Sequence, residues 1–135
     1  MNPSKMEIHV DIDEAAKAVD ILSAHCAVSK QKLKQAMSKG AVWLTDKGKP
    51  QRLRRAAKVL QKGQILHLYY DSEVLDKLPE TPLLIEDRGA YSIWHKPSGL
   101  LSQGSKWGDH CTIMRWAEQN LSPQRNAFSI HRLDR

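Results

Sequence analysis

Apolar and polar residues alternate over positions 6–12, and this period-two pattern predicts a half-buried β-strand. The pattern then becomes helical, with apolar residues three or four positions apart: Ala15, Val19, Leu22 and Cys26. This spacing places one apolar stripe along a helix over about 14–26, with Asp13 in front of it as a capping residue. The chain therefore begins with a strand followed by an amphipathic helix.

A second helix is predicted directly after the first. Ser29 is a good N-cap because its hydroxyl accepts from a free backbone N–H, and Val28 is placed to pack on Leu33 as a hydrophobic staple. The apolar stripe of this helix consists of Leu33, Ala36 and Met37. Gly40 ends the helix, where a left-handed backbone conformation is needed. The two helices are expected to form a helical hairpin.

Two more strands are predicted over 41–44 and 64–70, which makes residues 1–70 a compact helix-helix-strand-strand unit. Residues 71–82 contain two prolines, four acids and few apolar anchors, so we expect a linker between domains there. Beyond the linker, residues 83–135 are expected to be mainly β.

In this second part, strands are predicted over 83–86 and 90–94 on either side of a turn, and a last strand over 127–130. A short helix is predicted over about 111–120. The expected fold class is α+β: a small helix-helix-strand domain followed by a second, mainly β segment.

Composition excludes several classes of protein. Hydrophobic residues make up 41% of the 135 positions, so the chain can bury a core, and no run of 18 apolar residues predicts a membrane span. The N-terminus lacks the apolar core of a signal peptide, which makes the cytoplasm the default location. Cys26 and Cys111 are not at the spacing of a zinc site, so we expect reduced thiols and no metal.

The distribution of charge is more informative than the net charge of +6. Residues 29–63 hold eight lysines and three arginines against one acid, or 11 − 1 = +10, whereas the rest of the chain has 10 basic and 14 acidic residues, or −4. A solvated basic face without a ligand is the alternative. So one-sided a segment favours a polyanionic partner, because neutralised phosphates release condensed counterions.

The same segment carries a resemblance. The hairpin with Ser29-Lys30, its basic second helix, Gly40 and Lys62-Gly63-Gln64-Ile65 resembles the alpha-L type of RNA-binding domain over roughly residues 13–70. That domain occurs in a small-subunit ribosomal protein, in tyrosyl-tRNA synthetases and at the front of many pseudouridine synthases. The chain departs from the family's asparagine-glycine turn (Thr45-Asp46-Lys47-Gly48) and from its glycine-aspartate pair (Gly63-Gln64).

The resemblance implies that the basic face of the second helix lies along RNA phosphates, which set position and affinity. Together with the charge of the segment, it gives these candidate RNA-binding residues: Ser29, Lys30, Lys32, Lys34, Lys39, Arg52, Arg54 and Arg55.

Two motifs in the second part sharpen the expectation. Tyr91 to Trp94 lead into the turn Lys96-Pro97-Ser98-Gly99, and His131-Arg132-Leu133-Asp134-Arg135 follows 35 residues after Lys96. In this order they resemble the ribosomal large subunit pseudouridine synthase A family. The resemblance implies that Asp134 is catalytic and that Arg132 binds RNA by stacking in the space left by the target base. It also implies that four residues shape the active site: Lys96, Pro97, Gly99 and His131.

The chemistry of pseudouridine formation suits these residue types. The reaction breaks the bond between ribose and base nitrogen, turns the uracil and rejoins it through a ring carbon. A carboxylate can act as nucleophile or as base, and which of the two applies stays open. The uracil is both leaving group and acceptor, so no cofactor is expected. The target base must leave its stack, at a cost of a few kcal/mol.

The family's catalytic domain continues beyond the aspartate motif. We therefore expect these 135 residues to be an N-terminal portion, inactive by itself, in which residues 83–135 pack incompletely. A non-catalytic RNA-binding protein with a decayed catalytic segment is the rival hypothesis, and a DNA-binding helical hairpin is a weaker one. Whether the RNA is ribosomal or transfer RNA, and what the oligomeric state is, both stay open.

Overall fold

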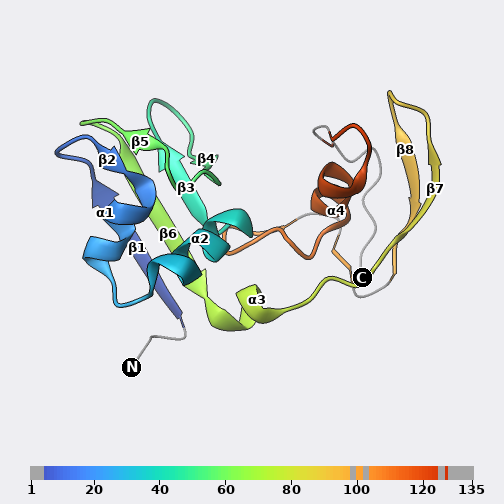
Figure 1. Cartoon of the computed structure of the whole chain (residues 1–135), viewed down its shortest axis with the longest axis horizontal. Coiled ribbons are helices and arrows are strands. Elements are labelled where there is room, and N and C mark those ends of the chain that lie inside the picture. Colours follow the sequence, from blue (N-terminus) through green and yellow to red (C-terminus); the bar gives the residue numbers. More distant parts are fainter. Residues whose placement is uncertain (1–4, 98–99, 102–103, 125–126, 128–135) are drawn as a thin grey trace. The chain divides into compact units, whose positions relative to one another are not determined.

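A computed structural model describes residues 5–97, 100–101, 104–124 and 127. The described part is mixed α+β, with four helices and three antiparallel sheets (Figure 1). The chain forms two compact units, and the first contains Met1–Asp76 together with Lys106–Gly108. The second contains Lys77–Ser105 and Asp109–Arg135. The first break between the units lies within the segment 71–82.

The first unit is built on a four-stranded antiparallel sheet in the order β1-β6-β3-β4. Its strands are β1 (Lys5–Asp11), β6 (Ile65–Asp71), β3 (Val42–Thr45) and β4 (Gln51–Arg52). A second sheet pairs β2 (Ala16–Lys17) with β5 (Val59–Leu60). The strands predicted over 6–12, 41–44 and 64–70 are confirmed as β1, β3 and β6.

The first helix, α1 (Ala18–His25), is shorter than the predicted range of 14–26. Its first backbone N–H groups donate to a neighbouring segment, Ala18 to the carbonyl of Lys58 (2.9 Å) and Val19 to that of Ala56 (3.1 Å). The two residues just before the helix, Ala16 and Lys17, form strand β2 and pair with β5. The helix therefore begins later than the apolar spacing predicted, because hydrogen bonds to a distant segment set its first residue.

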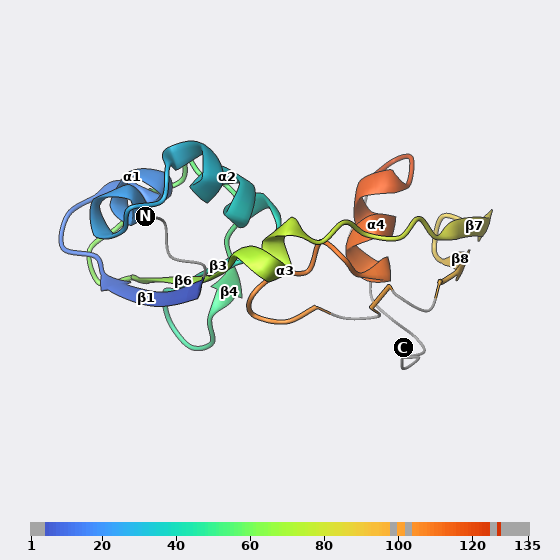
Figure 2. The ribbon, with the colours of Figure 1, turned by 90° about the horizontal axis from the view of Figure 1, so that it is seen from below.

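The second helix, α2 (Lys30–Ser38), confirms its predicted ends. Ser29 Oγ accepts from the backbone N–H of Lys32 (3.2 Å), and Val28 and Leu33 are both buried. After the helix, Gly40 has φ 93°, a left-handed value that glycine adopts without steric cost. Both helices lie on one face of the sheet (Figure 2).

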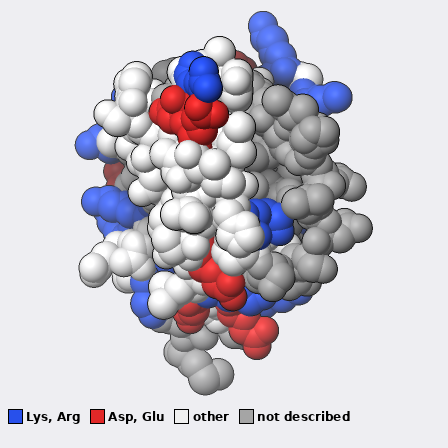
Figure 3. Space-filling view, turned by 90° about the vertical axis from the view of Figure 1, so that its right-hand side faces the viewer, with Lys and Arg blue, Asp and Glu red and all other residues white. Residues whose placement is uncertain are grey.

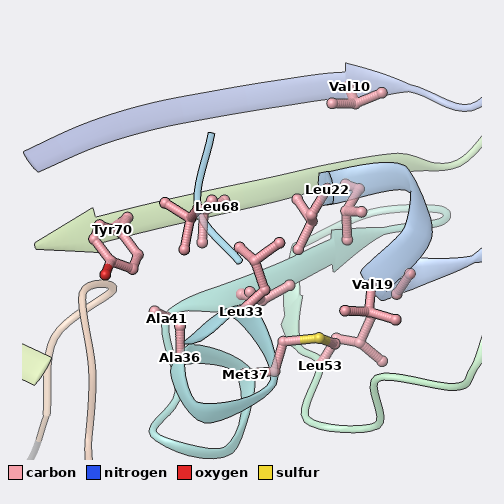
Figure 4. Close-up of a cluster of buried hydrophobic side chains, with 14 of the residues drawn as sticks. Val10, Val19, Leu22, Leu33, Ala36, Met37, Ala41, Leu53, Leu68 and Tyr70 are labelled. Atoms are coloured by element: carbon pink, nitrogen blue, oxygen red, sulfur yellow. The ribbon is translucent and has the colours of Figure 1, made fainter. Parts of the chain in front are cut away.

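The core of the first unit fills the space between these helices and the sheet (Figure 4). Leu22, Leu33 and Met37 of the helices are fully buried, as are Leu66 and Leu68 of β6. Along β6, buried and partly exposed residues alternate, because successive side chains of a strand point to opposite faces of the sheet. The other face of the sheet therefore carries the polar and aromatic positions.

The segment 71–82 starts with a short helix, α3 (Ser72–Asp76), within the first unit. Leu75 is buried there, and Lys39 Nζ donates to its backbone carbonyl (2.7 Å). One apolar residue of the predicted linker, Leu75, therefore packs in the core of the first unit.

The second unit contains the hairpin β7 (Leu83–Asp87) and β8 (Ser92–His95), and α4 (Ile113–Asn120), which Thr112 caps. The predicted hairpin and helix are confirmed, whereas the strand predicted over 127–130 falls almost entirely outside the described residues. Five large apolar side chains of the hairpin region are exposed: Leu83, Leu84, Ile85, Tyr91 and Ile93. Figure 3, which faces the β7–β8 side, shows mainly uncharged described surface with scattered acidic and basic groups.

The core account predicts that Leu22→Ala lowers the free energy of unfolding of the first unit by about 2–5 kcal/mol, because a buried leucine leaves a cavity. Val59→Ala, at a side chain that is 49% exposed, is the control and should cost under about 1 kcal/mol. Urea denaturation followed by far-UV circular dichroism measures both. Equal costs for the two variants would contradict this core assignment.

Candidate nucleic-acid interface

The first two turns of α2 present lysines to solvent. Lys30, Lys32 and Lys34 are exposed, while Leu33, Ala36 and Met37 anchor the opposite side of the helix in the core. The first turn contains no acidic residue. Because the N-terminal end of a helix already has a partial positive charge, these lysines add to a positive potential that is unfavourable without a nearby anion.

Lys30 has a partial counter-ion within the protein. Its Nζ lies 2.9 Å from Asp20 Oδ1 of α1, and both side chains are about half exposed. The hydrogen bond from Lys30 is the main cause that holds the pKa of Asp20 below its ordinary value; burial opposes it, and the charges of nearby lysines add to it. An exposed ion pair contributes only about 0–1 kcal/mol, so Lys30 can exchange Asp20 for a phosphate oxygen at little cost.

Three other predicted RNA-binding cations hold the C-terminal end of α2. Arg54 Nη1 donates to the carbonyl of Ser38 (2.9 Å), and Arg52 Nε donates to that of Gly40 (2.9 Å). Lys39 binds the carbonyl of Leu75. Of the three accepting carbonyls only that of Ser38 belongs to α2, whose last carbonyls lack helical partners and carry a partial negative charge that favours cations. These side chains therefore stabilise the fold, whatever else they contact.

Arg52 has a second structural contact. Its guanidinium lies over the indole ring of Trp43, 4.3 Å from the ring centroid, in the neighbouring strand β3. Arg55, by contrast, is exposed. The arginine run therefore divides into positions that hold α2 and one that faces solvent, a division that the sequence does not reveal.

A basic depression lies beside the turn between β3 and β4. It has a volume of about 300 Å³, and its charged lining residues are Asp46, Lys47, Lys49, Arg52 and Lys58. Four cations against one carboxylate make it suited to an anion. These lysines contribute to the charge of residues 29–63, but nothing in the sequence singles them out as a site. Only the fold shows that Lys58 lies beside the turn.

The motif residues of the second unit are described only in part. Lys96 Nζ donates to the carbonyl of Leu100 (2.7 Å), and the backbone N–H of Leu100 donates to the carbonyl of Pro97 (3.1 Å). Lys96 is the first residue of this turn, and its side chain binds the backbone of Leu100 at the other end of the turn. The side chain of Leu100 is fully buried. The remaining predicted site residues, Gly99, His131, Arg132 and Asp134, lie outside the described residues.

Two searches of the described residues gave negative results. No group of three or more histidine, cysteine, aspartate or glutamate side chains is arranged to hold a metal ion there. None of the described helices is both long enough and apolar enough to cross a membrane.

Comparisons of the chain with protein-family models, with curated proteins and with solved structures found no significant match.

The division among the arginines gives a testable prediction. Arg52→Ala should lower the free energy of unfolding by about 1–2 kcal/mol, because it removes a charged hydrogen bond and a cation–π contact. Arg55→Ala should change it by less than about 0.5 kcal/mol. Urea denaturation of both variants measures the difference. If Arg55→Ala costs as much as Arg52→Ala, the assignment of Arg52 to the end of α2 is wrong.

Proposed function

We propose that this chain belongs to an RNA pseudouridine synthase, with the first unit as its RNA-binding module and residues 83–135 as the beginning of its catalytic domain. The observation that carries the RNA-binding part is the first half of α2, a buried apolar stripe with Lys30, Lys32 and Lys34 exposed beside a serine-capped helix start. These cations project from a helix that is anchored in the core and has no acid in its first turn.

Charge complementarity supports RNA phosphates as the partner of these lysines. Phosphate contacts depend on cations held at defined positions, and helix N-termini are recurrent sites of such contacts. The basic depression beside the β3–β4 turn, with Lys47, Lys49 and Lys58, offers a second cationic area on the same unit. Structured RNA, ribosomal or transfer, is the substrate class that we propose.

The catalytic part of the proposal rests on the two motifs of the sequence. In the described residues, Lys96 and Pro97 form a turn in which Lys96 binds the carbonyl of Leu100, in agreement with an active-site shaping role for that turn. Asp134 is the proposed catalytic carboxylate, and Arg132 the residue that replaces the displaced base.

The hairpin β7–β8 gives further support for a larger catalytic domain. An isolated two-stranded hairpin is marginally stable in water, and exposed apolar clusters mark surfaces that another element covers. Leu83, Ile85 and Tyr91 are at least half exposed. We propose that this hairpin pairs and packs with further strands of the catalytic domain.

The RNA-binding part predicts that Lys32→Glu/Lys34→Glu weakens binding to structured RNA. The slope of log affinity against log salt should fall in magnitude by about 1 for each lysine that contacts a phosphate. Lys17→Glu/Lys77→Glu is the matched control, with the same change of net charge at two exposed positions outside α2. Filter binding at several salt concentrations measures the slopes. Equal losses in the two double variants would mean that RNA binding depends on net charge and not on α2.

The catalytic part predicts that Asp134→Ala abolishes pseudouridine formation in the product of the complete reading frame, reducing the rate by at least about a hundredfold. Asp76→Asn, at an exposed carboxylate outside the motif, should leave the rate unchanged. Tritium release from labelled uridine in RNA measures turnover. RNA binding through α2 without any turnover in the unmodified protein would instead favour the non-catalytic RNA-binding protein.

A further inference from the structure

The face of the main sheet away from the helices carries a pair of histidines. The register places His9 of β1 directly opposite His67 of β6. The residues next to them in the strands, Val10, Leu66 and Leu68, are buried in the core, so the two histidines lie on the other face of the sheet. The Nδ1 atoms of the two imidazoles face each other at 2.6 Å. About 45% of the His9 side chain is exposed, so the pair is open to solvent.

Each ring is held by a hydrogen bond at its other nitrogen. His9 Nε2 lies 2.7 Å from Glu7 Oε2, and His67 Nε2 lies 2.8 Å from Thr45 Oγ1. A carboxylate only accepts, so His9 Nε2 carries a proton and donates to Glu7. At 2.6 Å the two Nδ1 atoms share a hydrogen bond, so His67 Nδ1 donates to His9 Nδ1 and His67 Nε2 accepts from the Thr45 hydroxyl. Transfer of the His67 proton to Nε2, where Thr45 Oγ1 is able to accept it, leaves a lone pair on both Nδ1 atoms.

We propose that His9 and His67 form a binding site for a divalent transition-metal ion of the zinc type, with their Nδ1 atoms as ligands. Glu7 and Thr45 orient the two rings from behind, as carboxylates and other acceptors do for metal-binding histidines. Water completes the coordination, because the described residues supply no third histidine, cysteine or carboxylate ligand.

The geometry needs only a small adjustment to admit the ion. Zinc–nitrogen distances of about 2.0–2.1 Å with tetrahedral angles place two ligand nitrogens about 3.3 Å apart. The observed separation is 2.6 Å, so the rings must move apart by about 0.7 Å. Side chains on a solvent-facing strand pair accommodate such a movement more easily than a packed core does.

The aromatic neighbour of the pair limits ring rotation, and the ligand type limits the choice of metal. Only an unprotonated imidazole nitrogen binds a metal ion. The ring of Tyr69 stacks beside His67 and meets His9 edge-on. Imidazole nitrogen selects zinc, copper or nickel over magnesium and calcium, which prefer oxygen ligands.

Zinc titration of the whole chain tests the proposal without RNA, so its outcome is independent of the proposed function. Zn²⁺ should raise the Tm of the wild-type protein, because a ligand that binds only the folded state stabilises it. Neither His9→Gln nor His67→Gln should show this rise. His25→Gln is the matched control and should keep it, because His25 Nδ1 bonds the carbonyl of Ile21 on α1, away from the pair. Mg²⁺ should have no effect on any of the proteins.

Glu7→Gln separates orientation from ligation, since it should weaken zinc affinity by about 10–100-fold without abolishing it. Nitrogen NMR of the imidazoles in the wild-type chain gives a readout that does not depend on how the variants fold, with the Nδ1 resonances of His9 and His67 shifting together on addition of Zn²⁺. Unshifted Nδ1 resonances in excess Zn²⁺, or an equal rise in Tm in wild type and His9→Gln/His67→Gln, would overturn the proposal.

Discussion

The pairing of β6 with both β1 and β3 is the constraint on which the first unit depends. The register is fixed by alternation: Leu66, Leu68 and Tyr70 point to the helices, so the residues between them must point away. A shift by one residue would expose the core leucines and bury His67 and Tyr69. The same pairing therefore positions α2 on one face and the histidine pair on the other.

The basic residues of the first unit have different structural roles. A charge of +10 in residues 29–63 first suggests a uniform RNA-binding surface, but the fold gives its cations different tasks. Arg52, Arg54 and Lys39 bind carbonyls around the C-terminal end of α2 and its neighbour α3. Lys32 and Lys34 lie exposed in the first two turns. The helix is thus held at its end by some cations and presents others to solvent, so charge reversal at different positions should have different effects.

Local signals in the sequence were sufficient for α2. Its cap at Ser29 and its end at Gly40 depend on hydrogen bonds and backbone angles within a few residues, which residue types encode directly. The start of α1 was not predictable in this way, because it is set by carbonyls from residues 56 and 58. Long-range pairing also decides the histidine site. His9 and His67 are 58 positions apart, and only the strand register brings them together.

The motifs of the second unit show a different limit. The turn at Lys96 follows from its proline and neighbouring residues, and the structure adds the contact with Leu100. Asp134 and Arg132 lie outside the described residues, so their proposed roles depend on the order and spacing of the motifs. The exposed apolar residues of β7–β8 agree with a segment that needs further strands to bury them.

The central claim is that α2 is where this chain contacts RNA, and backbone amide NMR during a titration with a structured RNA tests it most directly. The account predicts that the largest shifts fall on residues 29–34, with further shifts around the turn between β3 and β4 and little change in β7 and β8. Largest shifts on the β7–β8 hairpin, with α2 unchanged, would contradict it.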